Sequence, residues 1–153
     1  MSSLSALIGQ DVIARDTATR LGTADGVVVD AETRRIVAVQ LGTKKSSRFV
    51  SWEQIRGIGT DAVIIESADA PHDADGPLEA RAAGGHASML GKLVLDDDGD
   101  ALGTVDDVAF NESTGTVDGV RVADRDLDGD RLLGIGSYAV VVRSDRTVDA
   151  SPR

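Results

Sequence analysis

The chain has 153 residues, and its 26 acidic residues outnumber its 16 Lys and Arg residues, which gives a formal net charge of −10. An acidic surface of this kind repels phosphate backbones, so nucleic acid is not an expected partner. The chain has no Cys, which excludes disulfides, thiolate metal sites and cysteine nucleophiles. No apolar run is long enough to span a membrane. We therefore expect a cytoplasmic protein without an integral membrane segment.

The chain repeats itself in order, and this repeat predicts two copies of one module. Three motifs return in the second half: Leu7-Ile8-Gly9 as Met89-Leu90-Gly91, Leu21–Asp25 as Leu102–Asp106, and Gly57-Ile58-Gly59 as Gly134-Ile135-Gly136. Modules this small bury only a modest fraction of their surface, so we expect the two copies to stabilise each other or to be stabilised by a partner chain. Only 3% of the residues are aromatic, and the aliphatic remainder is typical of a small β-barrel or sandwich.

The first copy is predicted to consist of short strands joined by polar turns. The expected strands, in chain order, are 11–14, 20–30, 36–41 and 48–51, followed by a closing segment over 58–66 with a turn at Gly59-Thr60-Asp61. Gly26 lies inside the long second strand and indicates a bulge or a close backbone approach there. Residues 51–55 predict a single helical turn, with Ser51 in the N-cap position.

Residues 68–86 interrupt the strand pattern and contain two of the three prolines. Their small, acidic composition favours a flexible linker, with at most one helical turn over 78–83. The two histidines, His72 and His86, lie in this stretch and are expected to be solvated. The predicted domains are therefore 1–67 and 87–146, with a linker over 68–86 and a tail over 147–153.

The second copy follows the same order of strands, at 92–95, 102–111, 116–122 and 138–143. Residues 96–100 are acidic and predict a hairpin turn, since Asp-Gly between strands is a strong hairpin signal. Residues 123–133 are short and acidic, and they show no match to the segment from Phe49 to Trp52. The two copies are therefore predicted to differ most at this point.

The ordered set of motifs resembles the PRC-barrel family. The motifs are a hydrophobic-Gly opening, a Leu-Gly-Thr-x-Asp-x-Val strand, the segment Phe49–Ile55 and the closing Gly-Ile-Gly turn. Similar domains are the cytoplasmic barrel of the H subunit of photosynthetic reaction centres and the C-terminal barrel of a ribosome-maturation factor. The resemblance implies a six-stranded β-barrel that acts as a protein-contact or assembly module. It implies no catalytic residues.

Asp124, Asp126 and Asp128 are the candidate metal ligands. Together with Gly129 they match the first half of an EF-hand loop, with acidic residues at positions 1, 3 and 5 and Gly at position 6. The twelfth position, which should supply a bidentate Glu, is Ile135. A solvated acidic turn is therefore the favoured interpretation. A weak Ca²⁺ or Mg²⁺ site is the alternative, and no other cofactor is expected.

The candidate interaction residues are Trp52, Lys44, Lys45 and Arg48. A lone Trp among aliphatic residues is most simply a core residue, but Trp is also enriched at interface hot spots. The three basic residues form a cluster in an acidic chain. They could meet an acidic partner or, as we favour, the acidic turns of the other copy.

These observations predict an all-β fold of two small PRC-like barrels in tandem, joined by a flexible linker. The barrels are expected to pack as a pseudo-symmetric pair, like the two halves of a homodimer. The expected function is non-enzymatic protein interaction or assembly, with a protein partner or with a second copy. The alternative is a cation-binding or ligand-sensing protein that uses the acidic turns of the second copy.

Overall fold

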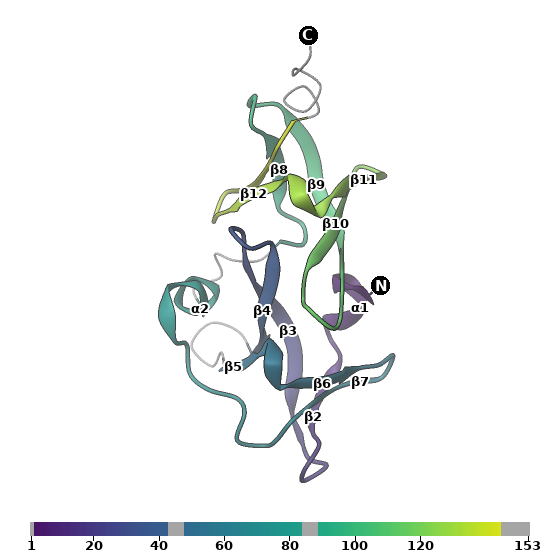
Figure 1. Ribbon diagram of the computed structural model, residues 1–153, viewed down its shortest axis with the longest axis vertical. Helices are drawn as coiled ribbons and strands as arrows, with labels where there is room; N and C mark the ends of the chain where they lie inside the picture. Colours follow the sequence, from purple (N-terminus) through teal and green to yellow (C-terminus); the bar gives the residue numbers. More distant parts are fainter. Residues whose placement is uncertain (1, 43–47, 84–88, 145–153) are drawn as a thin grey trace.

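The computed structural model describes residues 2–42, 48–83 and 89–144, and it confirms an all-β fold with one sheet for each copy. Figure 1 shows the two sheets one above the other along the longest axis of the molecule. The strands of the first sheet are β2 (Asp11–Ala14), β3 (Arg20–Asp30), β4 (Arg35–Leu41), β5 (Arg48–Ser51), β6 (Ile55–Ile58) and β7 (Ala62–Ile65).

The first sheet has the strand order β5-β4-β3-β2-β7-β6. Strands β2 and β7 are parallel, and the other neighbours are antiparallel. The 3₁₀ helix η2 (Trp52–Gln54) joins the two edge strands, β5 and β6. A link this short reaches at most about 14 Å, at roughly 3.5 Å per residue. The two edges must therefore lie close together, as in a small barrel.

The second sheet repeats this arrangement in the order β11-β10-β9-β8-β13-β12. Its strands are β8 (Leu93–Asp96), β9 (Ala101–Phe110), β10 (Val117–Val122), β11 (Arg125–Asp128), β12 (Leu132–Ile135) and β13 (Ala139–Val142). The short strand β1 (Ser2–Ser3) also joins this sheet, because it pairs with β9. The helix α1 (Leu4–Leu7) follows it. The N-terminal residues thus cross from the first copy to the second.

The segment predicted to lack a repeat does repeat in structure. Strand β11, the 3₁₀ helix η3 (Gly129–Arg131) and β12 take the places of β5, η2 and β6. Leu127 pairs with the middle of β10 as Val50 pairs with the middle of β4, and both side chains are buried. Only the inward positions of such a strand must be apolar, so the outward positions are free to differ. This freedom hides the repeat in the sequence.

Gly129 explains why the second copy has no Trp at this place. It is the counterpart of Trp52, since each is the first residue of its 3₁₀ helix. A Cβ atom at Gly129 would lie 1.8 Å from the carbonyl oxygen of Val117. No side chain fits at that distance, so the position must be glycine.

The two copies contact each other through equivalent hairpins, which confirms pseudo-symmetric packing. The backbone N–H of Ile36 donates to the carbonyl of Gly115 at 2.7 Å, and that of Val117 donates to the carbonyl of Arg34 at 2.8 Å. Each pair repeats the other with the copies exchanged. The backbone pairing is symmetric, but the side chains differ: Arg34 in the turn of the first hairpin corresponds to Gly115 in the turn of the second.

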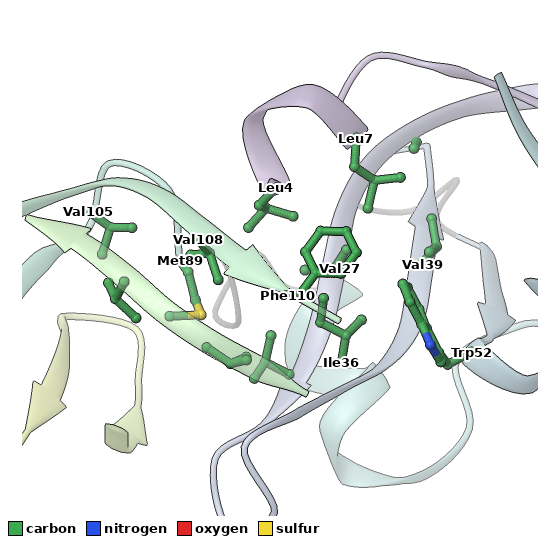
Figure 2. Close-up of a cluster of buried hydrophobic side chains, with 14 of the residues drawn as sticks. Leu4, Leu7, Val27, Ile36, Val39, Trp52, Met89, Val105, Val108 and Phe110 are labelled. Carbon is green, nitrogen blue, oxygen red and sulfur yellow. The ribbon is translucent and has the colours of Figure 1, made fainter. Parts of the chain in front are cut away.

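A single buried cluster contains residues of both copies. Figure 2 shows Phe110, at the end of β9, among Leu7, Val27 and Ile36 of the first copy. All four side chains are buried. Since burial of apolar surface is the main favourable contribution to folding, a shared core makes the two copies one folding unit.

The predicted bulge is present in the structure, and the predicted linker is more ordered than a flexible segment. The register of β3 against β4 shifts between Ala24 and Gly26, which confirms the predicted bulge. The predicted linker is more structured than expected, because it contains the helix α2 (Gly76–Ala83) and a β-bridge from His72 to Phe49. In the described part of the chain, no helix combines the length and apolarity needed to cross a membrane.

Candidate functional site

Trp52 is a contact between the two copies, so the interpretation of this residue as an exposed anchor is wrong. Its side chain is only 5% exposed. The indole N–H donates to the carbonyl of Glu112 at 3.2 Å, and the ring meets Phe110 edge-on at 5.7 Å between centroids. A Cβ at Gly115 would lie 3.2 Å from the indole nitrogen. The Trp fills the junction and is not available to an outside partner.

Arg48 does not contact the acidic turns of the second copy. Its guanidinium donates to the carbonyl of Pro71 at 2.7 Å and lies 4.0 Å from a carboxylate oxygen of Asp73. It therefore holds the segment between the copies against the first sheet. Lys44 and Lys45, the other members of the predicted basic cluster, lie outside the described residues.

The candidate metal ligands belong to a hairpin and not to a cation-binding loop. Asp124 lies in the turn before β11, and Asp126 and Asp128 lie on β11 with their side chains exposed. Asp126 is paired with Arg121 at 3.2 Å. Among the described residues, no three His, Asp or Glu side chains come together as metal ligands. Asp96–Asp100 forms the predicted turn, in which the Asp96 carboxylate accepts from the backbone N–H groups of Asp98 and Asp100.

The outer faces of the two sheets can be compared residue by residue, because their registers agree. The Val28–Ala38 pair of the first sheet corresponds to the Ala109–Gly119 pair of the second. The Gln40–Phe49 pair corresponds to the Arg121–Asp126 pair. At these four positions the first copy thus carries three apolar residues and Gln40, whereas the second carries two small residues and two charged ones.

The outer face of the first sheet is covered by the chain itself. Val28, Ala38 and Phe49 form a second buried cluster with Ala82 of α2, and Leu78 packs against its side. The side-chain amide of Gln40 donates to the carbonyl of Ala82 at 3.4 Å. The imidazole of His72 bonds to the carboxylate of Glu79 at 2.9 Å, so His72 is not the solvated residue that was expected. This cover removes Phe49 completely from solvent.

The outer face of the second sheet is open in the described structure and forms a hollow of about 490 Å³. We call it the acidic hollow. Its lining residues are Ser3, Asp107, Ala109, Asp118, Gly119, Arg121, Asp126, Leu127 and Asp128. Ala109 and Gly119 are partly exposed, whereas their counterparts Val28 and Ala38 are buried. The hollow therefore occupies the place that α2 fills on the first copy.

Two charged groups in the acidic hollow are held by specific contacts. Asp107 accepts from the backbone N–H of Ser5 at 2.9 Å and from its hydroxyl at 2.7 Å. Burial raises the pKa of Asp107, but these bonds, the N–H of Val108 and the charge of Arg121 outweigh it, so the pKa lies below its usual value. The hydrogen bond and charge of Asp126 raise the pKa of Arg121. At neutral pH the hollow thus carries fixed charges.

Sequence reasoning missed the acidic hollow because its residues are far apart in the chain. Asp107, Arg121 and Asp126 lie on three different strands. One signal was present: Leu127 lies between the charged residues Asp126 and Asp128, which is the alternation of a strand with one face exposed to solvent. The same residues also match half an EF-hand loop, so the local sequence fits two different structures.

Comparison with known proteins agrees with this geometry. The family model described as the PRC-barrel domain matches residues 1–70 and, a second time, residues 85–150. No curated protein matches the chain. The two family matches contain the two sheets and span most of the sequence. The chain belongs to the PRC-barrel family and contains two copies of its domain.

Proposed function

We propose that this protein is a non-enzymatic interaction or assembly module whose contact surface is the acidic hollow of the second copy. The observation that carries the proposal is a difference in exposure between the equivalent outer faces of the two sheets. The first copy covers its face with α2, while the equivalent face of the second copy is exposed among the residues that the structure describes. A hollow in which a few charged and polar side chains converge is a usual form of binding site, so this face is a candidate for binding.

The shared core supports this function because it makes the hollow rigid. Strand β9, which lies under the hollow, is fixed by β1 on the outside and by Phe110 in the common core. A face that is ordered before binding loses little conformational entropy when a partner arrives. The open face is therefore suited to binding without rearrangement.

The charges of the hollow fit a binding role better than a catalytic one. The lowered pKa of Asp107 makes its carboxylate a weak base at neutral pH. Arg121 is paired with Asp126 across the strands. Groups held in one charge state stabilise a complementary charge on a partner, which is a contribution to specificity and to the rate of association.

Affinity capture from native cells with matched charge variants tests the proposal. The bait variant Asp126→Lys/Asp128→Lys reverses two exposed charges of the hollow. The control variant Asp61→Lys/Asp69→Lys makes the same charge change at two exposed residues outside it. We expect the wild type and the control to retain a common protein, or further copies of the chain, that the hollow variant loses. Equal capture by all three would contradict the proposal.

A further inference from the structure

The first copy shows in detail how a segment binds to this kind of sheet. Residues 71–83 make two contacts, one with the edge of β5 and one with the outer face. At the edge, the N–H of Phe49 donates to the carbonyl of His72 at 2.8 Å, and the N–H of His72 donates back at the same distance. On the face, Leu78 and Ala82 of α2 pack over Phe49. One extended residue followed by a helix thus covers both the edge and the outer face of the first sheet.

The second copy offers the same edge without a cover in the described structure. Ala123 and Asp124 form the two-residue turn between β10 and β11, with φ angles of 50° and 66°, as a type I′ turn requires. Such a turn makes Val122 and Arg125 the hydrogen-bonded pair. The next pair, Arg121 with Asp126, is then not hydrogen-bonded through the backbone. The N–H and C=O of Asp126 consequently point away from β10.

Asp126 is the counterpart of Phe49, whose outward N–H and C=O bind His72. Within the described residues, no backbone group occupies the outward N–H and C=O of Asp126. An unpaired strand edge is a ready template for an added strand residue. The second sheet therefore has both an open edge and an open face, at the two places where residues 71–83 bind the first sheet.

The charge of the acidic hollow indicates the chemistry of the occupant. Four carboxylates line it, those of Asp107, Asp118, Asp126 and Asp128, against the single guanidinium of Arg121. An excess of negative charge on the lining favours a partner that carries positive charge. At the base, Ala109 and Gly119 are smaller than Val28 and Ala38, which leaves room for longer side chains than those of α2. Lys and Arg meet both requirements.

We propose that the second copy binds a basic helical segment of a partner protein, with one extended residue paired to the β11 edge at Asp126 and the following helix lying in the acidic hollow. This inference rests on the proposed function and names the partner's chemistry. The chain's own covering segment is a poor occupant in trans. Residues 71–83 contain Asp73, Asp75 and Glu79 against one Arg, so a second copy would bring acidic charge to an acidic face.

A synthetic helical peptide tests the inference directly. The probe carries Leu and Ala along one face and Lys along both flanks, and a matched peptide has Glu at every Lys. Binding to the full chain is measured by calorimetry, and the contact is mapped by backbone amide shifts in NMR spectra. We expect the Lys peptide to bind and to shift residues of β10 and β11, and the Glu peptide not to bind. Shifts spread over the whole chain would overturn the inference.

Charge variants separate a specific site from the general attraction of a basic peptide to an acidic protein. Asp126→Lys/Asp128→Lys is expected to weaken binding by about tenfold or more. Asp61→Lys/Asp69→Lys, with the same net charge, is expected to change it by less than about twofold. Equal losses in both variants would mean attraction to net charge alone and would overturn the inference.

A second pair of variants tests the edge contact. Asp126→Ala and Asp126→Pro both remove the carboxylate, but only the proline removes the N–H that points outward. Pro is tolerated at such an edge position because no ladder bond is lost. We expect the proline variant to bind the Lys peptide about fivefold or more weakly than the alanine variant, the loss of one hydrogen bond. Equal affinities would overturn the edge pairing.

These outcomes are distinct from failure of the proposed function. A native partner captured through the hollow, together with no binding of the Lys peptide, would overturn the basic helix and leave the interaction module intact. Specific binding of the Lys peptide supports the inference whether or not a native partner is captured.

Discussion

The two sheets share strand order and register but treat their outer faces in opposite ways. The first sheet places Val28, Ala38 and Phe49 on this face and buries them under α2. The second places Ala109, Gly119 and Asp126 at the same positions and leaves them in contact with solvent. The difference teaches that one duplicated fold can carry two unlike outer surfaces: the first contributes buried apolar contacts, and the second presents charged residues, which is the surface that we propose for binding.

The side chains on each outer face explain whether that face is covered. An uncovered apolar face would associate with other molecules, so the first copy needs its helix. A charged face needs no cover, because its side chains are solvated. The predictions below test this contrast, beginning with the largest effect.

Removal of the Phe49 ring should destabilise the contact between the first sheet and α2. The residue is fully buried between β4, β5 and α2, so Phe49→Ala is expected to lower the free energy of unfolding by about 3–5 kcal/mol. The matched change on the second face, Asp126→Ala, removes an exposed side chain and should change it by less than about 0.5 kcal/mol. Urea denaturation of both variants checks the difference. Similar losses would show that the two faces contribute alike.

The asymmetry of the 3₁₀ helices should appear as an intolerance to Ala at Gly129. The new Cβ would collide with the carbonyl of Val117, so Gly129→Ala is expected to cost about 2–3 kcal/mol. Gly134→Ala is the control, because no atom lies within 4 Å of its added Cβ. Thermal unfolding measures both. A Gly129→Ala protein as stable as the wild type would contradict the close approach of Gly129 to the carbonyl of Val117.

The Ser5–Asp107 contact should make stability depend on acid pH. The pKa of Asp107 is lowered in the folded state, so this carboxylate stabilises the fold above its unfolded pKa of about 4. The stabilisation is lost as the pH falls through the folded pKa. Ser5→Ala removes one bond to the carboxylate and should cost about 1 kcal/mol at pH 7 and less at pH 3. A pH-independent loss would contradict this origin.

The smallest effect is expected from divalent cations. Because Asp124, Asp126 and Asp128 follow one another along a hairpin, and no three acidic side chains of the described residues come together as ligands, we expect Ca²⁺ or Mg²⁺ to shift the Tm by less than about 1 °C relative to NaCl of equal ionic strength. Differential scanning calorimetry checks this. A larger shift that disappears in Asp126→Asn/Asp128→Asn would restore the cation site.

The duplication, the all-β class and the family resemblance could be predicted from the sequence, because glycine turns and alternating strands are local signals. Strands 11–14 and 48–51 agree with β2 and β5 at both ends. The equivalence of β5 and β11 could not be predicted. Only their inward residues, Val50 and Leu127, must match, and single apolar residues carry little information.

The cover on the first sheet was missed for a different reason. The covering segment, which contains His72, Leu78 and Ala82, has no strong helix or strand pattern in its sequence. It is held by contacts with the β5 edge and with Phe49. Tertiary contacts of this kind override local composition. The acidic hollow follows the same logic, because its charges converge only when β9, β10 and β11 are side by side.

Residue-resolved amide exchange of the free protein tests the central contrast most directly. The N–H of Phe49 is bonded to His72, whereas the N–H of Asp126 points out from the edge of β11. After correction for intrinsic rates, we predict that the Phe49 amide exchanges at least about a hundredfold more slowly than that of Asp126. Equal protection of the two amides would show that the second edge is already covered, and it would contradict the account.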